Sequence, residues 1–355
     1  MNASPKRPLA GASGLWDKLD PAKTHALKEY KHDSPLLGCR FDPSGQFVFA
    51  GAQDNCVVRW HLDSGKKTPL SGHKSWVRAL AFAAKAKRLF SGDYAGRILV
   101  WPVDADEPKP ARTIDAHRGW VRALAVSPDG QTLASCGNDG LVKLWSSADG
   151  KFMRELAGHG CHVYNVAFHP DGKHLVSADL KGVVKVWDWT KGEVERELDA
   201  KMLYKYDAGF LADIGGVRSM AFSADGSLLA CAGITNVSNA FAGVGNPLVV
   251  LFDFKNGKQK QLLRPKAPFQ GTAWGAVVHP SGFVAGVGGG NGGMLWFWKP
   301  DNGQDFFNLK LPNNARDLDL HADGRRLAVA FFDGAVRTYG MEAPAAASAV
   351  GQRTH

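Results

Sequence analysis

The sequence lacks any run of apolar residues that approaches the ~18 needed to cross a bilayer. Residues 1–20 also lack the short apolar core of a secretory signal. Cysteine is scarce: the five cysteines are scattered and contain no Cys-x-x-Cys pair, so reduced thiols are expected rather than a disulfide framework. These absences predict a cytoplasmic protein without a membrane partner.

Recognisable metal and cofactor motifs are absent as well. No His and Cys residues have the spacing of a zinc site, and no Asp-x-Asp-x-Asp-Gly calcium loop occurs. Gly288, Gly290 and Gly293 fit G-x-G-x-x-G, but they lead into an expected strand at residues 294–298, whereas a dinucleotide site needs a helix N-terminus. We therefore expect no metal and no cofactor.

Glycine, proline and tryptophan, by contrast, are well represented. The 355 residues include 41 glycines, 18 prolines and 11 tryptophans, a composition that predicts many tight turns. The net charge of +9 favours anionic partners through long-range attraction, although it says nothing about the fold.

A short turn pattern ending in glycine recurs along the chain. An apolar run precedes each turn, a second follows it, and a third ends in an aromatic residue. This pattern predicts short β-strands. The usual spacing of about 42 residues is typical of propeller repeats. The turns lie at residues 42–45, 127–130, 169–172, 223–226, 279–282 and 321–324, with a degenerate copy at 83–86, which makes seven.

Two residue types keep their place in the repeat. The aromatic residue that ends the third run is Trp60, Trp101, Trp145, Trp187, Phe252, Trp298 and Tyr339 in turn. Histidines precede the first four tryptophans by one constant separation; they are His32, His73, His117 and His159. Together with Gly72-His73, Gly158-His159 and Trp187-Asp188, this pattern resembles the WD-repeat family.

The resemblance covers roughly residues 24–339 and implies an all-β fold. The expected structure is a seven-bladed β-propeller of four-stranded antiparallel blades around a central channel. The last repeat stops at its third strand, whereas residues 25–30 look like a strand without a blade, so this N-terminal strand is expected to complete the last blade. The expected propeller spans residues 24–340, between flexible tails at 1–23 and 341–355.

The third repeat contains a serine, a histidine and an aspartate, the residue types of a nucleophilic triad. The family resemblance implies instead a structural hydrogen-bond chain within one blade, from an indole through a hydroxyl and an imidazole to a carboxylate. Its members are Trp145, Ser135, His117 and Asp139. The second and fourth repeats are expected to keep the chain only in part, because Ala95 and Lys181 replace the aspartate. No enzymatic activity is expected.

The repeats also align one position at the start of each first strand, where WD-repeat proteins line the channel mouth on the top face. Arginine can pair with carboxylate or phosphate through two parallel hydrogen bonds, and Trp, Tyr and Arg are enriched in binding hot spots. The expected partner-binding surface consists of Trp76, Arg78, Tyr94, Trp120, Arg122, Tyr164, Arg218, Trp274, Arg316 and Phe332.

Two insertions, at about residues 199–215 and 234–247, stretch the fifth repeat and are expected on the same top face. They contain too many large apolar side chains for purely disordered segments. They either grip a partner or pack on each other. The candidate contact residues are Tyr204, Tyr206, Phe210 and Phe241.

These features favour a non-catalytic, monomeric scaffold that binds an acidic or anionic protein or peptide on its top face. A propeller enzyme of the metal-dependent hydrolase type is an alternative, but it needs ligands around the channel, where only His162 and Asn314 are candidates. A nucleic-acid-binding protein is a second alternative. It is disfavoured because the positive charge is spread along the chain and no nucleic-acid-binding motif occurs.

Overall fold

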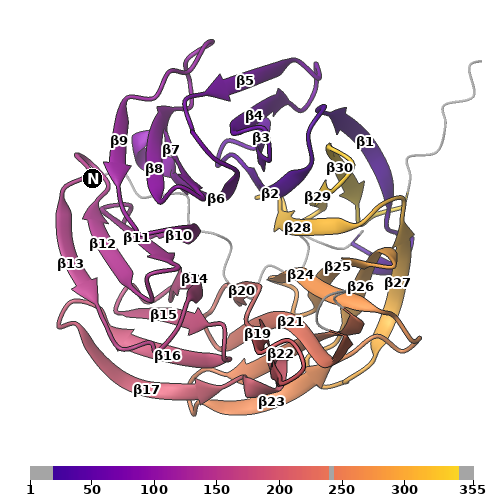
Figure 1. Ribbon diagram of the computed structural model, residues 1–355. Helices are drawn as coiled ribbons and strands as arrows, with labels where there is room; N and C mark the ends of the chain where they lie inside the picture. The colour runs from indigo at the N-terminus through magenta and orange to yellow at the C-terminus, as the bar shows by residue number, and fades with distance from the viewer. Residues whose placement is uncertain (1–18, 240–243, 344–355) are drawn as a thin grey trace, which may run out of the picture.

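Seven four-stranded antiparallel sheets, the blades, surround a central channel in the computed structural model, which describes residues 19–239 and 244–343 (Figure 1). The predicted seven-bladed propeller is confirmed. From the channel outward, blade one contains β2 (Leu36–Phe41), β3 (Phe47–Ala52), β4 (Cys56–His61) and β5 (Lys67–Ser71), and blade two contains β6 (Val77–Ala83), β7 (Arg88–Asp93), β8 (Arg97–Pro102) and β9 (Arg112–Asp115). Blade three contains β10 (Val121–Val126), β11 (Thr132–Gly137), β12 (Val142–Ser146) and β13 (Phe152–Leu156), and blade four contains β14 (Val163–Phe168), β15 (His174–Asp179), β16 (Val183–Asp188) and β17 (Glu193–Asp199).

Blades five and six contain the longest strands. Blade five consists of β20 (Ser219–Phe222), β21 (Leu228–Asn239), β22 (Val244–Asp253) and β23 (Lys258–Leu263), and blade six of β24 (Gly271–Val278), β25 (Val284–Gly290), β26 (Gly292–Trp298) and β27 (Asp305–Leu311). Within the described residues, helical structure is limited to the 3-10 turns η1 (Pro21–Lys23), η2 (Ala84–Ala86) and η3 (Lys201–Leu203). No helix in that part of the chain is long and apolar enough to cross a bilayer.

Both ends of the chain build blade seven. Its inner strands are β28 (Ala315–Leu320), β29 (Arg326–Phe331) and β30 (Ala335–Gly340), and β1 (His25–Lys31) pairs antiparallel with β30. The predicted closure by an N-terminal strand is therefore confirmed. The pairing continues outward, where Leu19 forms a bridge with Glu342 and the Asp20 N–H donates to the Met341 carbonyl at 2.8 Å. The rest of the two expected tails, residues 1–18 and 344–355, lies outside the described residues.

The hydrophobic core is divided among the blade interfaces. Each of seven clusters of buried apolar side chains joins two neighbouring blades, and together the clusters continue round the whole ring. The aromatic residue that ends each third strand is buried in every blade. Burying one such side chain stabilises the fold by roughly 1.5–3 kcal/mol. No blade can bury both of its apolar faces alone, so the ring stabilises all of them together.

The hydrogen-bond chain of blade three runs within a single sheet. The Trp145 indole N–H donates to Ser135 Oγ at 2.9 Å. The His117 ring lies between this hydroxyl, 2.8 Å from its Nε2, and Asp139, 2.9 Å from its Nδ1. The buried indole and imidazole thus satisfy each other through one serine.

Blades two and four contain complete chains as well, so the expectation that Ala95 and Lys181 interrupt them is wrong. In these blades the carboxylates are Asp93 and Asp179, each 2.9 Å from the Nδ1 of its histidine. These aspartates end the second strand, where they reach the same ring nitrogen that Asp139 reaches from the turn. Blade three has Gly137 at the strand position, and a Cβ atom there would lie 2.8 Å from the His117 ring.

Burial of the blade-two chain predicts a pH dependence. Desolvation lowers the pKa of His73, and this effect outweighs the opposing hydrogen bond from Asp93. A histidine whose folded pKa lies below its unfolded pKa binds a proton more readily when unfolded. It therefore contributes full stability above about pH 6.5 and loses that contribution as the pH falls toward the folded value. We expect the His73 ring resonances in NMR spectra to titrate below pH 6.5; a midpoint at or above that value would contradict this.

Candidate functional site

A β-bulge opens almost every inner strand and aims one side chain at the channel mouth. In five blades the second residue of the inner strand has no register partner on the neighbouring strand, and in blade six the fourth residue of β24 has none. An extra residue of this kind bends the strand and redirects its side chain. The bulged residues are Leu37, Arg78, Arg122, Tyr164, Trp274 and Arg316. In blade five Arg218 takes the corresponding place just before β20, and its N–H donates to the Ala232 carbonyl at 2.7 Å.

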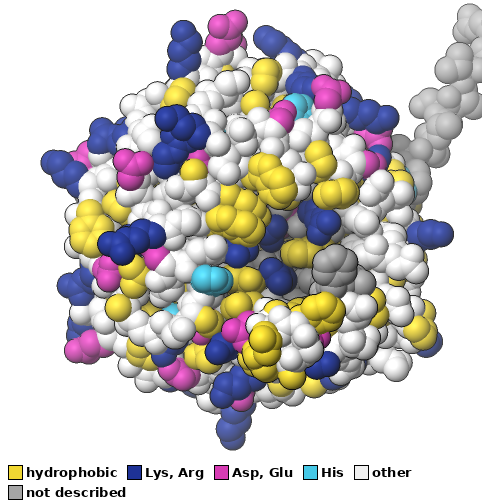
Figure 2. Space-filling model, in the orientation of Figure 1, with side chains coloured by type: hydrophobic (Ala, Val, Ile, Leu, Met, Phe, Trp, Pro, Cys, Tyr) yellow, Lys and Arg dark blue, Asp and Glu magenta, His cyan; other side chains and the backbone are white. Residues whose placement is uncertain are grey.

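The bulged side chains and their neighbours enclose one cavity of about 230 Å³, the top cavity. Figure 2 shows it as a central hollow with Lys or Arg side chains at its base and hydrophobic side chains along part of its rim. All ten residues predicted from the sequence to bind a partner line this cavity. Among the described residues, its lining is Leu37, Gln53, Trp76, Arg78, Tyr94, Trp120, Arg122, Tyr164, Arg218, Trp274, Arg316 and Phe332.

Four arginines, Arg78, Arg122, Arg218 and Arg316, line the top cavity. In the described part of the chain, Asp and Glu are absent from the lining. The ion pairs of arginine there involve other positions: Arg40, Arg97, Arg325, Arg326 and Arg337. The four guanidinium groups lie instead against aromatic rings. Arg122 is 4.2 Å from the Trp120 ring centroid and 4.4 Å from that of Tyr164, and Arg316 is 4.9 Å from that of Trp274.

Burial of these arginines is electrostatically unfavourable. Desolvation lowers the pKa of Arg122, Arg218 and Arg316, and repulsion from Arg78 lowers it further. A guanidinium group nevertheless stays charged in proteins. The Nε atoms of Arg218 and Arg316 are also buried without a hydrogen-bond partner among the described residues. A bound anion would offset this desolvation and repulsion and would accept the unused N–H groups.

Aromatic side chains form a row along one side of the top cavity. Tyr94 stacks on Trp120 with ring centroids 3.8 Å apart and planes 6° apart, and Trp76 lies 5.8 Å from Tyr94. Trp76 and Phe332 are exposed although both are large and apolar. A rigid, partly exposed aromatic row offers contact area at little cost in side-chain entropy, as binding hot spots do.

Sequence reasoning missed two polar residues at this site. Gln53 lines the cavity, and the Arg122 Nε–H donates to Asn138 Oδ1 at 2.6 Å, which fixes the guanidinium group. Both residues directly follow the second strand of their blades, the position that holds Tyr94 and Phe332 elsewhere. Extending the repeat alignment to that position in every blade would have found them.

The channel below the top cavity already contains its own counter-charge. A space of about 290 Å³ continues from the cavity and is lined by Arg40 and Asp317, among others. The Arg40 Nη1–H donates to Asp317 Oδ2 at 2.6 Å, and Asp317 also accepts the Cys39 N–H at 3.1 Å. This carboxylate is therefore engaged, and the unpaired positive charge is concentrated at the mouth.

The two insertions touch each other. The first contains η3 and a two-stranded hairpin of β18 (Tyr204–Asp207) and β19 (Ala212–Gly215), and the second extends β21 and β22 of blade five. Lys205 Nζ donates to the Val237 carbonyl at 2.6 Å, which joins them. Both strands of the hairpin contact β21 of blade five (Figure 1).

The large side chains of the first insertion divide between core and surface. Leu203 is buried in the cluster between blades four and five, whereas Tyr206, Phe210 and Leu211 are exposed. The Tyr204 hydroxyl donates to Asp213 Oδ1 at 2.6 Å within the hairpin. Phe241, the fourth predicted contact, lies outside the described residues. The insertions thus pack on each other and still present apolar groups to solvent.

A larger groove, of about 630 Å³, lies between blades one and two. Arg59 closes one side of it by donating to the carbonyls of Val103, Ala105 and Asp106 at 3.1, 2.8 and 2.8 Å. Its lining mixes aspartates with lysines, so their charges offset one another. The top cavity is the better candidate because its charge has one sign and its donors converge.

Comparisons with known proteins point to one repeat family. The family model described as "WD domain, G-beta repeat" matches residues 24–61, 65–102, 108–146 and 150–188. WD repeat and FYVE domain-containing protein 2 of Caenorhabditis briggsae is 31% identical over 75 residues, 21% of this chain and 18% of that protein. The mouse kinesin-like protein KIF21B is 40% identical over 67 residues, 18% of this chain and 4% of that protein. Nuclear distribution protein PAC1 of Arthroderma otae is 35% identical over 66 residues, 18% of this chain and 14% of that protein. The matched stretches thus span less than a fifth of each relative's length.

Proposed function

The chain belongs to the WD40 repeat family of β-propellers, and on this premise we propose that it is a non-catalytic scaffold that binds an acidic segment of a partner protein in the top cavity. The observation that carries the proposal is the convergence of Arg78, Arg122, Arg218 and Arg316 on one cavity whose described lining contains no carboxylate. Propellers of this family typically serve as platforms for protein interaction, and an acidic segment supplies the charge that this platform lacks.

The chemistry of the lining favours binding over catalysis. Arginine and aromatic side chains recognise carboxylates and apolar groups, but an arginine-rich wall offers neither a nucleophile nor a general base near neutral pH. Six aromatic residues surround the arginines, so a segment that alternates acidic and apolar side chains would fit best. The exposed side chains of Tyr206 and Phe210 lie on the same face and would extend the contact beyond the cavity.

A charge-reversal experiment tests this function. A random peptide library is selected on the wild-type protein, and an enriched peptide is then measured by fluorescence anisotropy against wild type and Arg78→Glu/Arg122→Glu. An arginine–carboxylate contact contributes roughly 1.5–3 kcal/mol, so the loss of two should weaken binding by at least ~100-fold. The enriched peptides are expected to be rich in Asp and Glu, and their affinity is expected to fall as the salt concentration rises.

The matched control reverses two arginines outside the cavity. Arg112→Glu/Arg154→Glu makes the same change of net charge on the outer strands β9 and β13 and should leave peptide affinity unchanged. Circular dichroism confirms that each variant is folded. Equal loss of binding in both double variants would indicate a general effect of net charge. Enrichment of peptides without acidic residues would contradict the proposal of an acidic partner. Tighter binding of single-stranded oligonucleotides than of any peptide would favour nucleic acid as the partner.

A further inference from the structure

Three turn histidines join neighbouring blades on the face opposite the top cavity. Each begins the turn after an inner strand, and its Nε2 lies near the carbonyl oxygen of a glycine in the equivalent turn of the next blade. The distances are 3.0 Å for His169 and Gly226, 2.6 Å for His279 and Gly324, and 3.2 Å for His321 and Gly45. Because a carbonyl only accepts, each Nε2 is assigned the ring proton and each Nδ1 a lone pair.

All three Nδ1 atoms accept a backbone N–H, from Asp171, Ser281 and Asp323 at 3.2, 3.0 and 3.1 Å respectively. In blade six the Ser281 hydroxyl lies 2.7 Å from His279 Nδ1. In blade seven Asp323 Oδ2 approaches His321 Nδ1 at 3.0 Å, and the Arg326 guanidinium supplies the positive charge between them. Its Nη2 lies 2.9 Å from His321 Nε2 and 3.2 Å from His321 Nδ1, and its Nε–H donates to Asp323 Oδ2 at 2.8 Å.

Blade four repeats the blade-seven arrangement with a histidine in place of the arginine. Asp171 Oδ2 lies 3.0 Å from His169 Nδ1, and His174 occupies the position that corresponds to Arg326. His174 Nδ1 lies 2.7 Å from the same carboxylate oxygen, while its Nε2 lies 3.0 Å from Glu195 Oε2 on β17. Both imidazole Nε2 atoms thus face acceptors, and both Nδ1 atoms face one anionic oxygen. In blade seven the corresponding position is held by Arg326, which is permanently charged, whereas blade four has His174 there.

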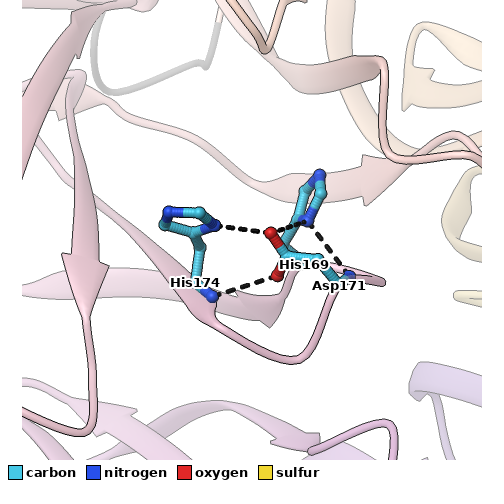
Figure 3. Close-up of side chains that lie close together, drawn as sticks. All are labelled: His169, Asp171 and His174. Carbon is cyan, nitrogen blue, oxygen red and sulfur yellow. Dashed lines mark hydrogen bonds and ion pairs between the residues drawn. The ribbon is translucent and has the colours of Figure 1, made fainter.

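The three side chains are held in place for a ligand (Figure 3). One ligand atom from each of His169, Asp171 and His174 lies within 4.8 Å of the other two. The His169 ring stacks on Phe254 at 4.5 Å and meets the edge of Phe222 at 4.9 Å, so it cannot turn freely. The side chains are 12%, 32% and 26% exposed respectively, so an ion can reach them from solvent.

We propose that His169, Asp171 and His174 bind a divalent transition-metal ion of the Zn²⁺ type through these three atoms. Two imidazoles and one carboxylate are donors that Zn²⁺ and its neighbours accept, and a fourth position stays open to water. The Gly226 carbonyl and the Glu195 carboxylate supply the outer hydrogen bonds that orient metal-binding histidines.

Metal binding requires a small rearrangement at the turn. Bonds of about 2.0–2.1 Å place tetrahedral ligand atoms about 3.3 Å apart, so the two Nδ1–Oδ2 separations must open slightly. The ion replaces the contact in which the Asp171 N–H donates to His169 Nδ1 at 3.2 Å. The sequence-based expectation of no metal site rested on linear zinc spacing, which this turn does not have.

Titration calorimetry with Co²⁺ and then Zn²⁺ tests the site on tag-free, EDTA-treated full-length protein. Wild type should bind one equivalent, Co²⁺ should acquire visible absorption bands, and Zn²⁺ should raise the melting temperature. His174→Arg, which copies blade seven, should remain folded and lose all three responses. Glu195→Gln removes only an outer hydrogen bond and should weaken metal binding by roughly 10- to 100-fold.

Asp171→Asn provides a second test should the arginine substitution unfold the turn, and it should also lose the metal. His61→Gln alters the histidine that ends β4 of blade one and should retain the wild-type affinity. Wild-type binding no tighter than that of His174→Arg would overturn the proposal, as would NMR evidence that His174 carries protons on both nitrogens and keeps them when Zn²⁺ is added. The site lies on the face opposite the top cavity, so its loss should leave peptide binding intact.

Discussion

Deletion of residues 1–31, which removes β1, is expected to abolish the cooperative folded state. β1 covers the edge of β30 along six register pairs, and its Tyr30 side chain is buried in the cluster between blades seven and one. The Tyr30 hydroxyl also donates to the Leu62 carbonyl of blade one at 2.7 Å. Without β1 the ring has an unpaired edge and an exposed interface, conditions that favour aggregation. Thermal unfolding and size-exclusion chromatography would report loss of the folded protein and of its cooperative transition.

A rearranged chain provides the control for this deletion. Moving residues 24–31 behind residue 343 through a short flexible linker restores the same strand in the same direction. Because β30 ends where β1 begins, the linker has only a hairpin to span. This variant should unfold within a few degrees of wild type. A deletion variant that melts cooperatively at the wild-type temperature would show that closure does not stabilise the ring.

Ser91→Ala is expected to be among the most destabilising single substitutions in the chain. Ser91 Oγ accepts the Trp101 indole N–H at 2.7 Å and lies 2.6 Å from His73 Nε2, and all three side chains are buried. Alanine leaves one buried donor and one buried acceptor without partners. Each unsatisfied group costs roughly 1–3 kcal/mol, so the free energy of unfolding should fall by about 2–6 kcal/mol. Chemical denaturation would measure the change.

The cost of Ser91→Ala comes from hydrogen bonding and not from packing. Blade one has Ala50 at the same strand position, fully buried, so an alanine side chain fits there. Ser64→Ala, at an exposed turn, is the control and should change stability by no more than about 0.5 kcal/mol. Equal effects of the two substitutions would mean that the buried chain contributes no more than a surface serine.

The fold was predictable because its signals repeat. The constant separation between histidine and tryptophan in four repeats points to the WD-repeat family, the seven recurring turns give the blade number, and the strand without a blade at residues 25–30 gives the closure. The positions around the top cavity follow from the same alignment, since each lies at a fixed offset from a turn. Arg78 or Trp274 alone would be a weak sign of a binding site. The repeat places an equivalent residue in every blade and therefore predicts a ring of such residues.

Features outside the repeat's strict spacing escaped prediction. Asp93 and Asp179 complete their chains from a strand end, because carboxylates at two different offsets can reach the same imidazole nitrogen. The β-bulges orient the side chains that line the cavity. Their positions depend on how neighbouring strands pair, and the residue types of a single sequence do not show that pairing. In the cluster at His169, His174 contacts Glu195, which lies on β17, the outermost strand of the blade. Only packing brings such residues together.

The shared blade has a practical consequence for attaching the protein to other objects. β30 ends, and β1 begins, at the rim opposite the arginines, where Leu19 meets Glu342. A sensor chip, fluorophore or fused domain joined at position 19 or 342 would lie on the face opposite the top cavity and leave the mouth facing solution. Two such attachments, one at position 19 and one at position 342, would lie close together and give strong energy transfer that is lost when β1 and β30 separate. Opening of the ring could thus be followed optically without altering any residue of the cavity.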